Sequence, residues 1–203
     1  MALHSGELQE HSSVSMRVYK DRGTKIGALV SKSSVTDPSN PTVIGTLLTK
    51  EIKKAKGLFV SNNYAYIIGE GLTIVDVSNP ASPQVVGRLV GTKAIAIYVS
   101  GSYAYLAGKG LIVVYVSNPS NPQVVGNLMT KEIKKAKALY ISGDYAYIAG
   151  KGLAVVDVSD STTPRTKDLL PIQKPSKVWG AGGFVYVVDK TGKLTVVDVS
   201  MCQ

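Results

Sequence analysis

One motif recurs along the chain at a spacing of about 41 residues. It reads LTIVDVSNPASPQVVG from Leu72, LIVVYVSNPSNPQVVG from Leu111 and LAVVDVSDSTTP from Leu153. Repeats of about 40 to 50 residues, made of short β patterns broken by Gly, Asn and Pro, are typical of β-propeller blades. The sequence therefore predicts an all-β protein, a β-propeller built from repeats of about 41 residues.

The second copy indicates how one repeat should fold. Alternating apolar and polar residues predict strands at residues 94–100, 103–108 and 111–117, joined by two-residue turns that contain Gly. The Pro-bracketed loop NPSNP then leads to a fourth strand at residues 123–128. Each repeat is thus expected to form a four-stranded antiparallel blade. Helix is expected only as a single turn within TKEIKKAK, a segment that occurs twice.

One aromatic position is shared by the predicted inner strands of the blades. The aligned copies place Phe59, Tyr98, Tyr140 and Trp179 at this position. In three of the copies a small residue lies two positions earlier, where the inner strands converge on the propeller axis. Because a large aromatic side chain can fill the widening gap between neighbouring blades, these four residues are predicted to have a packing role.

Three segments, LTIVDVSNP at residues 72–80, LAVVDVS at 153–159 and LTVVDVS at 194–200, resemble the LVIVD repeat family of β-propellers. The resemblance covers about residues 35–200. It implies a binding or structural scaffold more than a catalyst. It also implies a location outside the cell or at its surface, because these repeats occur mostly in bacterial and archaeal proteins that are often exported or attached to the cell surface.

The aspartates of this motif, Asp76, Asp157 and Asp198, are predicted to be structural. Tyr115 takes the same position in the second copy, so the carboxylate does not serve an identical role in every blade. Aspartate side chains readily accept hydrogen bonds from nearby backbone N–H groups. We therefore expect each of the three to orient the neighbouring turn.

The chain divides into an N-terminal segment, residues 1–34, and the repeats, residues 35–203. Five blades result if residues 16–20 and 25–35 are strands of a degenerate first blade. Four blades with an N-terminal arm result if residues 39–48 supply the outer strand of the last repeat, which hides both sheet edges. A third arrangement is an open arc that completes a larger ring with a second copy, as a homo-oligomer. We favour five blades.

Lysines concentrate in two classes of loop. Connections from an outer strand to the next inner strand, and turns between second and third strands, lie at the same end of an antiparallel blade. These segments hold fifteen lysines against four acidic residues, while the whole chain has a formal net charge of +9. The candidate binding residues among them are Lys53, Lys54, Lys56, Lys109, Lys134, Lys135, Lys137 and Lys151. The opposite end of the blades is nearly neutral.

Such a lysine-rich face would attract an acidic protein, an anionic glycan or another polyanion through a field that salt screens. The alternative is a structural or assembly scaffold, a fragment or subunit of a larger surface propeller, in which the lysines only aid solubility and oppose edge pairing. Sequence-specific nucleic-acid recognition is not expected, because the lysine cluster contains neither arginine nor aromatic residues.

An enzymatic role is not expected, and neither a metal nor a cofactor is predicted. The two histidines, His4 and His11, lie with Glu7 and Glu10 in the non-repeating N-terminal segment, where solvated side chains are the ordinary outcome. The paired glycines fit hairpin turns, since no strand-turn-helix pattern accompanies them. Neither a transmembrane stretch nor a signal peptide is expected, and the single cysteine, Cys202, has no partner for an intrachain disulfide.

Overall fold

The structure is a computed structural model that describes residues 13–19, 27–33, 43–52 and 54–200, the first two of these as backbone only. Their strands form three four-stranded antiparallel sheets, one three-stranded sheet and one two-stranded hairpin. The all-β fold predicted from the repeat is therefore confirmed. We number the four larger sheets blades 1 to 4 in chain order.

Each blade is a meander in which consecutive strands pair. Blade 1 contains β3 (Gly57–Ser61), β4 (Tyr64–Ile68), β5 (Gly71–Asp76) and β6 (Gln84–Val90). Blade 2 contains β7 (Ala94–Ser100), β8 (Tyr103–Gly108), β9 (Leu111–Tyr115) and β10 (Gln123–Leu128). Blade 3 contains β11 (Ala138–Ser142), β12 (Tyr145–Ala149), β13 (Leu153–Asp157) and β14 (Arg165–Leu170). Blade 4 contains β15 (Pro175–Ala181), β16 (Phe184–Asp189) and β17 (Leu194–Asp198).

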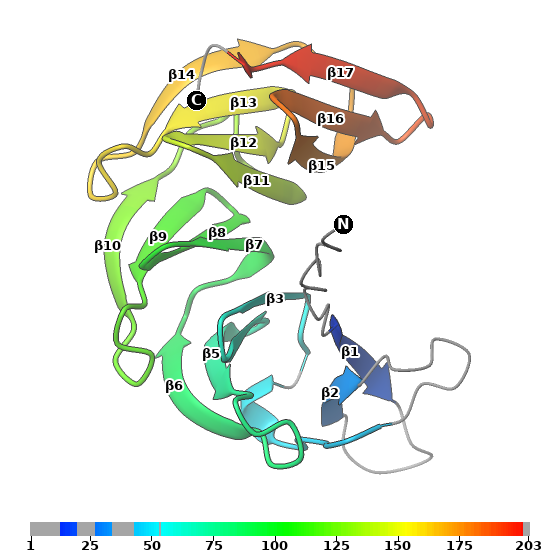
Figure 1. Cartoon of the computed structure of the whole chain (residues 1–203). Coiled ribbons are helices and arrows are strands. Elements are labelled where there is room, and N and C mark those ends of the chain that lie inside the picture. The colour runs from blue at the N-terminus through cyan, green and yellow to red at the C-terminus, as the bar shows by residue number, and fades with distance from the viewer. Residues whose placement is uncertain (1–12, 20–26, 34–42, 53, 201–203) are drawn as a thin grey trace, which may run out of the picture.

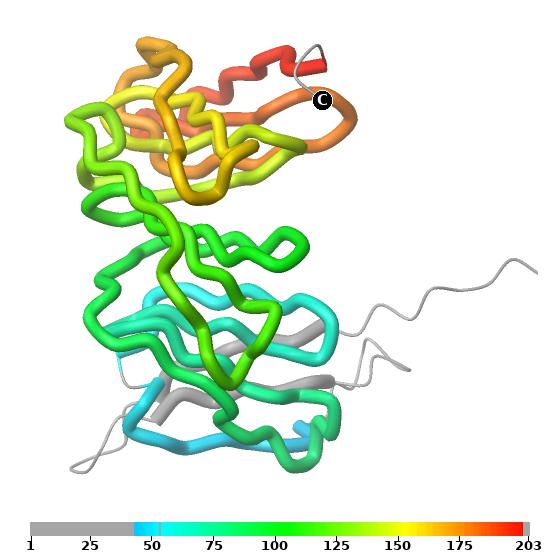
Figure 2. Tube along the Cα trace, turned by 90° about the vertical axis from the view of Figure 1, so that its left-hand side faces the viewer, coloured from blue at the N-terminus to red at the C-terminus, as the bar shows by residue number. Residues whose placement is uncertain are grey.

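The blades are arranged along an arc, with the first strand of each on its inner side (Figure 1). The inner strands β3, β7, β11 and β15 contact one another in this order. Seen from the side, successive blades lie one above the other from blade 1 to blade 4 (Figure 2). This is the arrangement of a β-propeller, in which each blade presents one face to the blade before it and one to the blade after it.

Buried aliphatic residues between neighbouring blades form the core. Leu72, Leu111 and Leu153 lie at the start of the third strands of blades 1 to 3, and each is completely buried. Leu72 packs with blade 2, Leu111 with blade 3 and Leu153 with blade 4. Burial of one such side chain contributes about 1.5–3 kcal/mol to folding. The LVIVD motif therefore supplies the apolar face that joins one repeat to the next.

The aromatic position of the inner strands forms a continuous row across the blades. The ring centroids of Phe59 and Tyr98 lie 4.7 Å apart, those of Tyr98 and Tyr140 lie 5.5 Å apart, and those of Tyr140 and Trp179 lie 5.7 Å apart. The predicted packing role between blades is thus confirmed for Phe59, Tyr98 and Tyr140. The row ends at Trp179, whose side chain stays 62% exposed because no further blade covers it among the described residues.

The second repeat folds nearly as predicted. Strands β7, β8 and β10 have the predicted bounds, whereas β9 ends at Tyr115, two residues early. The Val116 N–H still donates to the Ser102 carbonyl at 2.9 Å, in register with the Tyr103–Tyr115 pair, so one further ladder hydrogen bond follows the end of β9. The single helical turn is confirmed in the first copy of TKEIKKAK, as the 3-10 helix η1 (Lys50–Ile52), whereas residues 131–135 of the second copy form turns without a helix.

Strands do form in the N-terminal segment, as predicted for residues 16–20 and 25–35. They are β1 (Ser13–Tyr19) and β2 (Gly27–Ser33), which pair as an antiparallel hairpin. The hairpin lies at the blade 1 end of the arc, and β2 contacts η1 (Figure 1). The opposite end of the arc is blade 4.

The alternative in which residues 39–48 pair with the last repeat is not found for residues 43–48, the part of this segment that the structure describes. They form no ladder with β17, and Gly45 instead lies directly against the Pro80 carbonyl of blade 1. Gly87 and Gly126 make the same close approach to the Pro119 and Ser161 carbonyls of the following blade. Residues 43–48 therefore take the place of an outer strand that precedes blade 1, so they are not available to close the ring at blade 4.

Candidate functional site

The two classes of lysine-bearing loop meet at one end of each blade, as predicted. The Lys137 N–H donates to the Ala149 carbonyl at 2.8 Å and the Lys151 N–H to the Glu132 carbonyl at 3.1 Å. In blade 4 the Lys190 N–H donates to the Lys174 carbonyl at 3.2 Å. These backbone hydrogen bonds join the loop that enters an inner strand to the turn between the second and third strands. We call the surface formed by these loops and turns the lysine face.

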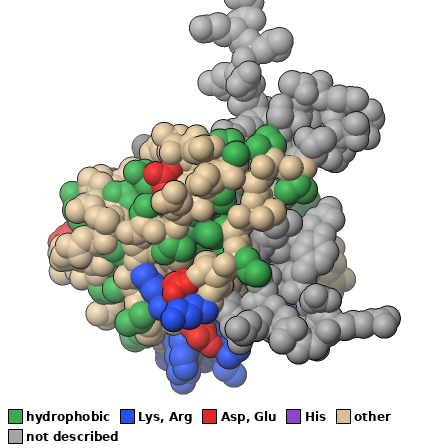
Figure 3. Space-filling model, turned by 90° about the horizontal axis from the view of Figure 1, so that it is seen from below, with side chains coloured by type: hydrophobic (Ala, Val, Ile, Leu, Met, Phe, Trp, Pro, Cys, Tyr) green, Lys and Arg blue, Asp and Glu red, His purple; other side chains and the backbone are tan. Residues whose placement is uncertain are grey.

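Seen from below, lysine and arginine side chains gather at one edge of the described surface, with a few acidic side chains among them (Figure 3). Most of the remaining visible surface is neutral or hydrophobic. This distribution agrees with the loop positions of the lysines in the sequence.

Buried isoleucines hold the two TKEIKKAK segments against the blades. Ile52 is 2% exposed and packs with the core on the outer side of blade 1. Its counterpart Ile133 is completely buried in the cluster between blades 2 and 3. The Ala136 N–H also donates to the Gly108 carbonyl at 2.9 Å, which ties the second segment to blade 2. The described lysines beside these anchors therefore lie on loops that pack against the blades.

One lysine position is repeated in every blade. Lys54, Lys93, Lys135 and Lys174 each lie three residues before the equivalent inner-strand positions, Gly57, Ala96, Ala138 and Lys177. Three of them have left-handed backbone, with φ of 61° at Lys54, 67° at Lys135 and 46° at Lys174. A residue with a Cβ atom pays roughly 1–2 kcal/mol for this conformation, and glycine would avoid most of that cost.

The candidate lysines predicted from sequence fall into three groups. Lys54, Lys56, Lys109, Lys134, Lys135 and Lys151 are exposed on the lysine face. Lys137 is half-buried, and its ammonium donates to the Pro175 carbonyl at 3.3 Å, so it also bridges blades 3 and 4. Lys53 lies outside the described residues. Among the other lysines predicted to lie in loops, Lys177 instead lies within β15.

Acidic partners are few on the lysine face. Lys54 donates to Glu70 at 2.9 Å, and this hydrogen bond and the Glu70 charge raise the pKa of Lys54. Backbone and Thr130 hydrogen bonds lower the pKa of Glu132, and the charges of Lys131 and Lys151 lower it further. Exposed ion pairs of this kind contribute little to stability. The carboxylates thus offset only part of the positive charge.

A depression of about 290 Å³ opens on this face at blade 2. Lys93 and Lys109 stand beside backbone from Gly91, Gly108 and Gly110, and Met129 completes the wall. The depression is thus bordered by two lysines and by glycine backbone. Sequence reasoning missed this depression, although the equivalence of Lys93 with Lys54 and Lys135 could have been found by aligning the repeats.

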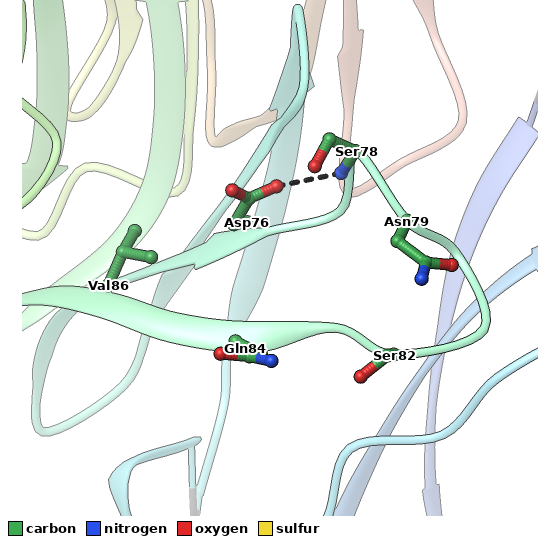
Figure 4. Close-up of a pocket in the computed structure, with 6 residues that line it drawn as sticks. All are labelled: Asp76, Ser78, Asn79, Ser82, Gln84 and Val86. Carbon is green, nitrogen blue, oxygen red and sulfur yellow. Dashed lines mark hydrogen bonds between the residues drawn. The ribbon is translucent and has the colours of Figure 1, made fainter.

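The opposite end of the blades is organised by turns. The Ser78 N–H donates to Asp76 at 2.8 Å, the Ser159 N–H to Asp157 at 3.0 Å and the Ser200 N–H to Asp198 at 2.9 Å. The structural role predicted for these aspartates is therefore confirmed. Figure 4 shows the Asp76 turn beside a depression of about 220 Å³ that Ser78, Asn79, Ser82, Gln84 and Val86 also line.

Other sequence candidates lie beyond the structure. His4, His11, Glu7, Glu10 and Cys202 are outside the described residues. Within the described part of the chain, no three or more His, Cys, Asp or Glu side chains are grouped as metal ligands. No helix in that part has the length and apolar character required to cross a membrane.

The repeated blades and their apolar contacts define a β-propeller repeat protein. The model of the LVIVD repeat matches residues 52–90, 91–130, 134–168 and 174–201. The chain therefore belongs to the LVIVD repeat family, as its motifs indicated. Its fold is that of a β-propeller repeat module. A search of curated proteins found no significant match.

Solved structures share the fold at low sequence identity. The computationally designed Ika4 protein is 15% identical, with a TM-score of 0.61 over 78% of this chain and 98% of that one. A protein of unknown function from Desulfotomaculum acetoxidans is 15% identical, with a TM-score of 0.58 over 86% of this chain and 68% of that one. A candidate 6-phosphogluconolactonase from Bacteroides uniformis is 12% identical, with a TM-score of 0.76 over 94% of this chain and 65% of that one. The chain thus spans about two thirds of this last protein.

Proposed function

We propose that the protein is a non-catalytic binding module whose lysine face engages an anionic macromolecule. The observation that carries this proposal is the left-handed backbone at Lys54, Lys135 and Lys174. Glycine or asparagine would adopt this conformation at a lower cost in stability. The presence of lysine at these three positions therefore supports a binding role for its ammonium group. A lysine needed only for solubility could lie at any exposed position.

The depression at blade 2 gives this face a place to hold an anionic group. Lys93 and Lys109 flank it, and the anchored loop that carries Lys134 and Lys135 adjoins the same turn through the Ala136 to Gly108 hydrogen bond. Several ammonium groups on fixed loops bind a repeating polyanion better than one isolated charge, because each contributes without further ordering of the backbone. A sulfated or carboxylated glycan, or an acidic protein, has the required charge.

A catalytic alternative could be drawn from the candidate 6-phosphogluconolactonase, but at 12% identity this similarity concerns the fold alone. The scaffold alternative has its own support, because Trp179 and other apolar side chains of blade 4, among them Leu194 and Val196, stay exposed. The binding role requires that substitution of the lysines weakens the binding of a polyanion, whereas the scaffold role does not.

The test is a titration with heparin, single-stranded DNA and anionic lipid vesicles at two salt concentrations. The double variant Lys134→Glu, Lys135→Glu should weaken binding at least tenfold and make it less sensitive to salt, because fewer counterions are released. Its control is Arg88→Glu, Arg165→Glu, which changes the net charge equally on exposed outer strands. Equal losses in the two variants would contradict a specific lysine face, and binding to none of the probes would favour the scaffold.

A second variant separates binding from folding. Lys135→Gly removes one charge and suits the left-handed φ of 67°. It should therefore weaken binding severalfold while the free energy of unfolding stays the same or rises. A variant that instead loses stability and keeps full affinity would contradict the proposed role of this position.

A further inference from the structure

Blade 4 has an apolar face that the described residues leave open. Trp179 is 62% exposed, Leu194 57%, Val196 52%, Phe184 40% and Val188 37%. The residues equivalent to Leu194 in blades 1 to 3 are Leu72, Leu111 and Leu153, all completely buried by the following blade. Contiguous apolar patches of this kind are rare on monomeric proteins and mark interaction surfaces.

The strand register places nine side chains of this open face in three rows. The rows are Lys177, Val188 and Leu194, then Trp179, Tyr186 and Val196, then Ala181, Phe184 and Asp198. A basic and an acidic residue thus occupy two opposite corners of an otherwise apolar face.

This pattern is self-complementary. Consider a twofold axis that lies in the interface plane, along the diagonal of the three rows from Ala181 to Leu194. Rotation about this axis places Lys177 of one copy opposite Asp198 of the other. The same operation sets Trp179 over Phe184 and Val188 over Val196. Aromatic residues then meet aromatic residues, and aliphatic residues meet aliphatic ones. The strands of the two sheets cross at close to a right angle, which is one of the two favoured ways in which sheets pack.

We propose that two copies of the chain form a symmetric dimer through the open faces of their fourth blades. The five exposed side chains named above leave roughly 500 Å² of apolar surface per copy, by the usual areas of such residues. The two faces together would bury about 1,000 Å², which is the lower limit for a specific interface. We therefore expect a dissociation constant of the dimer in the micromolar range. This interface is independent of the lysine face proposed to bind polyanions.

The single tryptophan makes the test direct, because Trp179 is the only one in the chain and lies in the proposed interface. Sedimentation equilibrium should show a monomer-dimer equilibrium, and the fluorescence of Trp179 should shift to shorter wavelength over the same concentrations. Val196→Asp should weaken the dimer more than tenfold. Its control, Val124→Asp, places the same change at another valine that is about half exposed, on β10 of blade 2, and should have no effect.

Charge exchange tests the twofold arrangement itself. Lys177→Glu and Asp198→Lys should each weaken self-association, because like charges then meet at the corners. Mixing the two variants should restore a heterodimer, since the introduced glutamate of one copy then faces the introduced lysine of the other, and the unchanged Asp198 faces the unchanged Lys177. A chain that stays monomeric at about 100 µM, well above the micromolar dissociation expected for an interface of this size, would overturn the proposal. A dimer that survives Val196→Asp, or a mixture without recovery, would overturn it as well.

Discussion

Single aspartates fix the turns that close the neutral end of the blades. Asp160 accepts hydrogen bonds from the Thr162 N–H at 2.9 Å and from the Thr162 and Thr163 hydroxyls at 2.6 and 2.8 Å. The two hydroxyls and then the Thr162 N–H lower the pKa of Asp160 from 3.8 to about 2. Asn79 and Asn118 accept the same backbone hydrogen bond in blades 1 and 2, so the turn itself does not require a charge.

These aspartates make stability depend on pH in a definite direction. Because the folded pKa of Asp160 is depressed, its contribution is present above pH 3.8 and is lost as the pH falls towards 2. Asp160→Asn should therefore reduce the fall in melting temperature across this range of pH. The reverse change, Asn118→Asp, should steepen it. Thermal unfolding followed by circular dichroism at several pH values would measure both, and parallel profiles for the two variants would contradict this account.

The outer strands β6 and β10 each approach the following blade closely at a glycine, Gly87 in β6 and Gly126 in β10. A Cβ atom at Gly126 would overlap the Ser161 carbonyl oxygen of blade 3 and lie 3.2 Å from Pro164 Cδ. Gly126→Ala should therefore separate β10 from this loop and cost about 1–3 kcal/mol, as overpacking does. Asn127→Ala, at the exposed neighbouring position of the same strand, should stay within about 0.5 kcal/mol of the parent. Urea unfolding would measure the free energy of unfolding of both variants. Equal values would contradict the prediction and show that the loop at Ser161 moves away without cost.

The repeat predicted most of each blade because the same local pattern is copied several times. Strand bounds in blade 2, the Asx turns and the aromatic row all follow from residues that are near in sequence or equivalent between copies. The ends of the arc could not be predicted in this way. The position of residues 43–48 depends on the contact of Gly45 with Pro80, and the open face of blade 4 depends on which residues pack beside it in space. The same is true of Asp168 in β14, which occupies the position of Gly87 in β6 and Gly126 in β10. A side chain fits there because no described loop of a following blade packs against this position.

The sequence predicted which loops carry the lysines of the lysine face, but not the backbone conformation of these loops or the depression between them. Positions in the meander were sufficient to assign Lys109 and Lys151 to the same end as Lys134. The left-handed φ of Lys54 and Lys135 has no sequence signature, since glycine and asparagine are the residues that ordinarily mark it. The depression beside Lys93 likewise forms only when the turns of blade 2 come together.

A chain of blades that contact only their neighbours should not be equally stable along its length. Blades 2 and 3 are covered on both faces, whereas blade 4 has an open apolar face and, among the described residues, no strand beside β17. Hydrogen exchange in dilute solution should therefore be faster in β15, β16 and β17 than in β11, β12 and β13. If blade 4 mediates self-association, its protection should rise with protein concentration, while that of blade 3 stays constant. Equal protection in the two blades at every concentration would mean that the last sheet is already covered within one chain.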